Sequence, residues 1–388
     1  MKKLKILLLF TSLLLWRSMR IESPLPDGWS AESRIRLSVL VLETPEYQDF
    51  RTIVRDGIWE VRIKGYAPII PGDRVEFSGP VQPKMVLNKV TKIVMLDPSW
   101  EVVSSPDPQT LSLKARFLIK VDEWRERWVS ILARTLPSPM AELAAGILLG
   151  VKGQMPTQFY QQLISTGTIH IVAASGFNVM VVASVLMSLG QRIWRRSVSI
   201  MVGVAGVLVY VMLAGASASV VRAGIMGSLT LIAYYFGRPA EAKRILWVTV
   251  YAMLLFNPLY IVDVGFQLSV AATAGLLYIE PWMRKLQSSV PCNDLGKQST
   301  ELKAQAYTFL VDYLYPTLAA TVATMPIILW HFGRLALISP LVNMLVLPVV
   351  PLIMLISALT LVGGQVLAWI AYVPLWWVVG VIRWFGQY

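Results

Sequence analysis

Residues 198–236 read VSIMVGVAGVLVYVMLAGASASVVRAGIMGSLTLIAYYF and contain one charged side chain, Arg222. They divide into two apolar runs, Val198–Ala216 and Val220–Phe236. Each is close to the ~20 residues that a helix needs to cross a bilayer. Six further runs share this apolar character: Ile169–Leu189, Ile245–Phe256, Tyr260–Glu280, Tyr313–Trp330, Ile338–Leu361 and Val366–Ile382. The sequence therefore predicts a mainly α-helical, polytopic membrane protein.

The overall composition supports this class and excludes others. Of the 388 residues, 55% are hydrophobic and 15% are charged, whereas soluble domains average about 25% charged residues. A water-soluble enzyme and a disordered chain are both excluded. One cysteine, Cys292, and two histidines, His170 and His331, are too few for a disulfide framework or a histidine-rich metal centre. We therefore predict no metal, no cofactor and no catalytic residues, and no Walker-type phosphate loop occurs in the chain.

The net charge of +12 suits either nucleic acid or an anionic membrane surface as a partner. Its distribution favours the membrane. Residues 21–106 carry 10 basic and 12 acidic side chains, so the basic excess lies in the other segments, which hold the apolar runs. Membrane topology alone produces that pattern.

The loops between the apolar runs predict the orientation. Gln191–Ser197 and Gly237–Arg244 each carry three basic residues, whereas Ala216–Ser219 and Asn257–Leu259 carry none. Basic loops face the cytoplasm, which puts His170 at the external end of its run. Residues 1–20 are predicted to be an uncleaved membrane anchor with a cytoplasmic N-terminus; a signal peptide is the alternative.

Residues 30–105 have a different pattern. Arg34–Val39 and Trp59–Lys64 alternate apolar and polar side chains, which is typical of half-buried strands. A turn at Pro71-Gly72-Asp73 precedes another strand, Arg74–Phe77, and Lys89–Leu96 is rich in β-branched residues. These features predict a small external β-barrel domain, best described as OB-like.

Residues 110–136 are predicted to form an amphipathic helix. Phe117, Trp124 and Trp128 recur at helical spacing on one face, and basic residues occupy the other. Two tryptophans on the apolar face suit a helix that lies in the membrane interface, and packing against the barrel is the alternative. The remaining residues, 138–388, are predicted to form the multi-helix membrane domain.

Polar groups inside the apolar runs are the candidates for function, because they are costly in lipid unless they face protein or water. Gly176 permits a helix break or a close approach of backbones. Arg222 either extends to the interface or pairs with Asp263 inside the bundle, and we predict the pair. For the small residues the alternative is helix packing, and for His170 it is an interfacial hydrogen bond. The predicted substrate path comprises His170, Ser175, Gly176, Asn178, Arg222, Asp263, Gln267 and Asn343.

The predicted barrel offers a second, weaker candidate site. Arg62, Lys64 and Tyr66 alternate along one strand face, where they could hold and stack single-stranded nucleic acid. The slight acidic excess of the region favours an ordinary solvated face instead.

Several motifs, taken together, resemble the ComEC family of competence proteins. They are Ala144–Gly150, Thr166–Gly176 with the pattern TG-x-x-H-x-x-A-x-SG, Val221-Arg222-Ala223, Gly265–Ser269 (GFQLS), His331–Arg334 and Ser339–Asn343. The chain departs from the family in having Asn178 where a histidine is usual. Larger members carry a C-terminal metallo-β-lactamase-like domain; with two histidines and an end at Tyr388, we expect a short form without that domain.

The resemblance implies a channel, not an enzyme, that passes single-stranded DNA across the cytoplasmic (inner) membrane of a bacterium. It implies membrane lipid, a separate DNA receptor, a nuclease and a cytoplasmic motor as partners, and leaves the oligomeric state open. Two alternatives remain: a transporter of another anionic or amphiphilic substrate, and a non-conducting scaffold for a surface assembly.

Overall fold

The computed structural model describes the following residues: 34–41, 45–48, 51–56, 59–65, 67–86, 89–104, 111, 113–151, 155–172, 175–237, 241–288, 301–333 and 335–387. They form two compact units, which are described separately. The first holds residues 34–130 and 254–259, and the second holds the remaining residues. The predicted anchor at residues 1–20 and the candidate Tyr66 lie outside the described residues.

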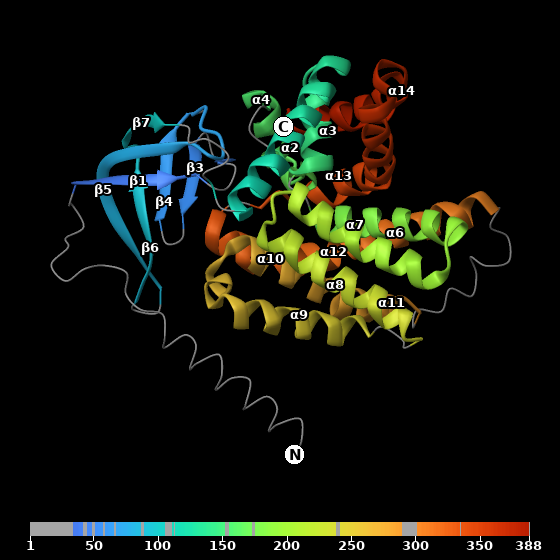
Figure 1. Cartoon of the computed structure of the whole chain (residues 1–388). Helices are drawn as coiled ribbons and strands as arrows, with labels where there is room; N and C mark the ends of the chain where they lie inside the picture. The colour runs from blue at the N-terminus through green and yellow to red at the C-terminus, as the bar shows by residue number, and fades with distance from the viewer. Residues whose placement is uncertain are drawn as a thin grey trace. The chain divides into compact units, whose positions relative to one another are not determined.

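The first unit is built on a curled, mixed sheet (Figure 1). Its described strands are β1 (Arg34–Leu40), β2 (Glu46–Gln48), β3 (Arg51–Asp56), β4 (Trp59–Lys64), β5 (Arg74–Val86), β6 (Lys89–Leu96) and β7 (Ser99–Ser104). Their order is β1-β5-β6-β4-β3-β2, and β7 also pairs with β5. Strands β4 and β6 are parallel, and the other pairs are antiparallel. In the described residues, β1 and β2 lie at the two ends of this order and do not pair with each other. The sheet is therefore a half-barrel rather than the closed barrel predicted.

Alternation along the strands produces the core of this sheet. Val75 and Phe77 in β5 are fully buried, and Glu76 between them is exposed. Val61 and Ile63 in β4 pack into the same cluster. The four predicted strands are confirmed. β2, β3 and β7 were not predicted. Glu46–Gln48 is too short to show a period-two pattern. Arg51–Asp56 has three consecutive buried residues, and Ser99–Ser104 has two adjacent valines, so neither alternates regularly.

The predicted amphipathic helix is α2, Leu113–Thr135. Its apolar face is only partly covered: Leu132 is fully buried, but Phe117 is 49% and Trp124 is 53% exposed. Exposed aromatic side chains on one helix face are what an interfacial helix requires. The location of α2 in a membrane interface stays a prediction.

The second unit is helical. Its helices are α3 (Met140–Leu149), α4 (Thr157–Ser165), α5 (Ile169–Val172), α6 (Gly176–Ile193), α7 (Arg196–Leu213), α8 (Ala218–Tyr235), α9 (Ala242–Phe256), α10 (Val264–Ala274), α11 (Glu280–Ser288), α12 (Glu301–Phe332), α13 (Ser339–Val346) and α14 (Val350–Phe385). Helices α6, α7 and α8 pack against one another, and α10 packs against both α8 and α12 (Figure 1).

Four segments among the described residues are long and apolar enough to cross a membrane. They are Gly176–Ile193, Arg196–Leu213, Ala218–Tyr235 and Ser339–Phe385. The predicted runs Val198–Ala216 and Val220–Phe236 correspond to α7 and α8. Mostly helical structure with several candidate spans is thus confirmed.

Other predicted runs are interrupted in the structure. Ile169–Leu189 is divided between α5 and α6. Tyr260–Glu280 begins in a 3-10 turn, continues as α10 and passes through a π-helical turn, Gly275–Ile279, before α11. The predicted run Ile338–Leu361 is divided among α13, a 3-10 turn at Leu347–Val349 and α14. Within α14, Gly364 has φ 56° and ψ −138° and separates two helical parts, so this break lies between the predicted runs Ile338–Leu361 and Val366–Ile382. Positive φ is accessible to glycine without a Cβ clash. Apolar character alone did not show the interruptions within Tyr260–Glu280 and Ile338–Leu361.

Candidate functional site

The break between α5 and α6 is the centre of the candidate site. Ser175 is extended and precedes α6, but its hydroxyl does not cap the helix. It donates instead to Oδ1 of Asn178, at 3.3 Å. The Asn178 side chain is 1% exposed, and its Nδ2 donates to the carbonyl of Ile147 at 2.8 Å. Asn178 therefore joins the start of α6 to α3, and its amide is a structural hydrogen-bonding group.

Arg222 of α8 lies against the same helix start. A Cβ added to Gly176 would be 3.3 Å from Nη2 of Arg222 and 3.3 Å from Cβ of Ala223. The guanidinium is held from the other side, because its Nη1 donates to Oγ1 of Thr273 in α10. The arginine is 5% exposed. The structure thus brings together four predicted residues, Ser175, Gly176, Asn178 and Arg222, at the start of α6. Asn178 and Arg222 are buried, and Ser175 and Gly176 are partly buried.

The predicted Arg222–Asp263 pair is wrong. Asp263 is exposed and caps the start of α10, where its Oδ1 accepts from the Phe266 amide at 2.7 Å. Arg222 reaches Thr273, ten residues further along α10, which is about 15 Å along a helix axis. Gln267 donates to the carbonyl of Ile261 at 2.7 Å and stabilises the turn before α10. Both Asp263 and Gln267 have local capping contacts that explain them without a substrate.

His170 and Asn343 belong to a second group. Nδ1 of His170 lies 2.9 Å from the carbonyl of Gly167. Gly167 has φ 69°, and a Cβ there would be 2.8 Å from Oγ of Ser339. Asn343 is 4% exposed, and its Nδ2 donates to the same Ser339 hydroxyl at 3.1 Å. In the described part of the chain, Oδ1 of Asn343 has no hydrogen-bond partner. This group joins the loop before α5 to α13.

The barrel candidates are less suited to bind nucleic acid. Arg62 donates from Nε to Glu60 at 2.7 Å, and Glu60 is 5% exposed. The ion pair leaves Arg62 less free to bind phosphate. Lys64 is exposed, which agrees with a solvated strand face.

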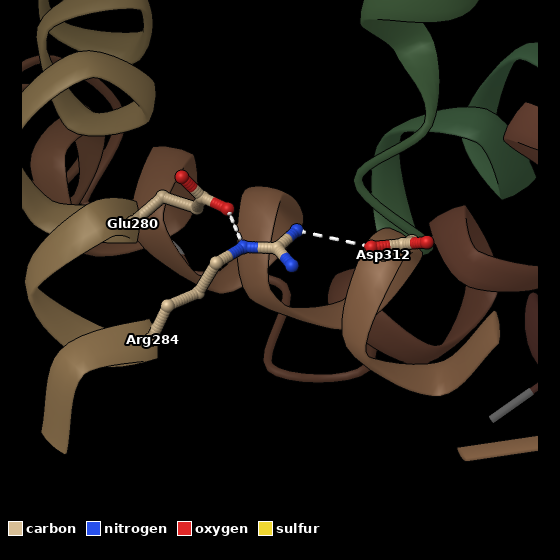
Figure 2. Close-up of polar contacts among 3 residues, drawn as sticks. All are labelled: Glu280, Arg284 and Asp312. Atoms are coloured by element: carbon tan, nitrogen blue, oxygen red, sulfur yellow. Dashed lines mark hydrogen bonds and ion pairs between the residues drawn. The ribbon is translucent and has the colours of Figure 1, made fainter. Parts of the chain in front are cut away.

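Sequence reasoning missed two features of the helical unit. Thr273 carried no signal of its own, because threonine is common in apolar helices. The second is an exposed cluster in which Arg284 of α11 contacts Glu280 on its own helix and Asp312 of α12, the latter at 3.1 Å (Figure 2). The hydrogen bond with Glu280 raises the pKa of Arg284 above its ordinary value. Because the cluster is open to solvent, it contributes little stability and serves to join the two helices.

The separate roles of Arg222 and Asp263 give a direct prediction. Asp263→Ala should cost about 1 kcal/mol of stability through loss of the cap. When combined with Arg222→Gln, the two losses should add to within about 0.5 kcal/mol, because the sites share no partner. Unfolding of the single and double variants in detergent measures this. A coupling free energy above about 1 kcal/mol between the two substitutions would show that Arg222 and Asp263 do interact.

Comparisons with known proteins show which family the chain resembles. A profile of the Competence protein family matches residues 147–388, which include both groups of polar residues. The chain is 26% identical over 242 residues to ComE operon protein 3 of Bacillus subtilis (strain 168), covering 62% of this chain and 28% of that one. It is 27% identical over 215 residues to Competence protein ComA of Neisseria gonorrhoeae, covering 53% and 28%.

A third relative, Uncharacterized protein YcaI of Escherichia coli (strain K12), is 24% identical over 238 residues, covering 59% of this chain and 30% of that one. No solved structure matches the chain significantly. The structure defines the class: a helical, largely apolar protein with several candidate membrane spans and polar side chains gathered at a helix break. The matched profile spans more than half of the chain. The chain therefore belongs to the Competence protein family. The matches span less than a third of each relative's length.

Proposed function

We propose that this chain forms a channel in the cytoplasmic membrane through which single-stranded DNA enters a bacterium during natural transformation. The observation that carries the proposal is the burial of a cationic side chain, Arg222 of α8, against the start of α6. Both helices lie within the family-matched segment. Two relatives are named competence proteins, which supports a role in DNA uptake. Ionisable groups within apolar bundles are retained where they serve a path for a polar substrate.

The remaining parts of the proposal follow from the predicted topology. The half-barrel and α2 lie on the external side, and the Arg284 cluster lies on the cytoplasmic side. Partners are membrane lipid, a receptor that delivers DNA, a nuclease that removes the other strand and a cytoplasmic motor. We propose no catalytic role for this chain, because two of its relatives are named as competence proteins.

Labelled DNA uptake tests the proposal. Cells that lack this chain should bind double-stranded DNA at the surface but fail to bring a labelled strand into the cytoplasm, and a plasmid copy should restore entry. Normal entry without the chain would contradict the proposal. If purified protein in liposomes instead moved another anion and no DNA, the alternative of a transporter for a different substrate would be correct.

The topology is tested with single cysteines. In a Cys292→Ser background, Ser104→Cys at the exposed end of β7 should react with an impermeant maleimide in intact spheroplasts. Ser197 is exposed at the start of α7, within the basic loop Gln191–Ser197. Ser197→Cys should react only after lysis, because basic loops stay in the cytoplasm. Labelling of both from the same side would reject the proposed orientation.

A further inference from the structure

The start of α6 carries unbalanced positive potential. The first N–H groups of a helix have no partners within the helix, and the aligned peptide dipoles amount to about half a positive charge there. A serine at this position usually accepts a hydrogen bond from the helix backbone. Here the Ser175 hydroxyl donates to Asn178 instead and does not cap. The helix start is thus open to an acceptor from elsewhere.

Arg222 adds a full positive charge at the same position. The Arg222 residue is only 5% exposed. Within the part of the chain that the structure describes, no carboxylate pairs with it. Its Nη2 lies 3.3 Å from the Cβ position of Gly176, the first residue of α6. A buried cation beside a positive helix end is costly unless an anion compensates it.

The guanidinium is also oriented for such an anion. Nη1 is occupied by Thr273, whereas Nε, among the described residues, has no acceptor. Nε and Nη2 form one edge of the planar group, and that edge matches two oxygens of a phosphate. Glycine at 176 lets the edge approach the helix backbone, because any side chain there would contact Arg222.

We propose that Arg222 and the backbone at the start of α6 bind a phosphodiester anion, one phosphate of the translocating DNA strand. The inference rests on the proposed function for the identity of the strand. Thr273 is a positioning residue that holds the guanidinium from α10. Lipid headgroups carry the same phosphodiester chemistry, so the test must separate the two sources.

The test uses the full chain in phosphatidylcholine nanodiscs and a fluorescent single-stranded oligonucleotide, with binding followed by anisotropy. Arg222→Gln should weaken binding about tenfold, as expected for loss of a charge-assisted bidentate contact. A methylphosphonate oligonucleotide of the same sequence has no backbone charge, so its affinity should not change with the substitution. Arg244→Gln is the matched control, because Arg244 is exposed and paired with Glu241, and it should bind as the unmodified protein does.

Equal binding of the phosphodiester strand by Arg222→Gln and the unmodified chain would overturn the inference. If Arg222→Gln does not fold, Arg222→Lys retains the charge without the fork and should still weaken binding severalfold. Inorganic phosphate should also raise the thermal unfolding midpoint of the unmodified chain relative to chloride at equal ionic strength, and no rise would count against the site.

The two proposals can fail separately. An unmodified chain that binds no oligonucleotide, yet is stabilised by inorganic phosphate through Arg222, would keep the anion site and reject the DNA function. Stabilisation by phosphatidylglycerol nanodiscs through Arg222, again without oligonucleotide binding, would assign the site to a lipid headgroup and overturn the DNA assignment.

Discussion

Replacing Gly176 by leucine is expected to reduce DNA uptake to the level of cells that lack the chain. The Cβ alone would touch Ala223 and Arg222 at 3.3 Å, so the rest of a leucine side chain must displace the guanidinium or fill the space beside it. Overpacking of this kind costs about 1–3 kcal/mol, which a folded bundle can withstand. Transformation frequency and the amount of protein in the membrane are measured together.

Gly380→Leu is the matched control, since a Cβ at this exposed helical glycine in α14 meets nothing within 4 Å. It should transform normally. Normal uptake by Gly176→Leu would show that the path lies elsewhere. Disappearance of the Gly176→Leu protein from the membrane would show that Gly176 serves packing alone. Asn178→His should lower protein stability, because it removes the buried amide contact to the carbonyl of Ile147.

Gly275→Ala is expected to have the largest effect on stability, about 3 kcal/mol. Gly275 begins the π-helical turn after α10. A Cβ there would lie 2.5 Å from the carbonyl oxygen of Ala319 and 2.8 Å from Cβ of Ala323, both on α12. Because the nearest atom is backbone, it cannot rotate away as a side chain could. The helices must separate, and the contact between α10 and α12 is lost.

Unfolding of the purified variants in mixed micelles measures this cost. Gly380→Ala makes the same chemical change in open space within α14. It should raise stability by up to about 1 kcal/mol, because alanine has the higher helix propensity. Equal midpoints for the two variants would mean that α10 and α12 do not approach closely at Gly275. Because Arg222 is held by Thr273 of α10, Gly275→Ala should also weaken the candidate anion site.

Much of the fold was predictable from local sequence pattern. The alternation in Trp59–Lys64 predicted β4, and the spacing of Phe117 and Trp124 predicted α2. Apolar runs such as Val198–Ala216 predicted the helices of the second unit. Each of these signals depends on neighbours a few residues apart, and the period of side-chain burial is set by the geometry of the element itself.

The candidate site was predictable only as a set of residues. The sequence by itself determined that Gly176, Arg222 and Asn178 are small or polar groups in apolar segments, where they need a partner. Which partner each one contacts was decided by the tertiary structure. Arg222 contacts Thr273 rather than Asp263, although both lie on or next to α10. The choice depends on how far α8 and α10 are shifted along each other, and no local pattern records the relative position of two helices.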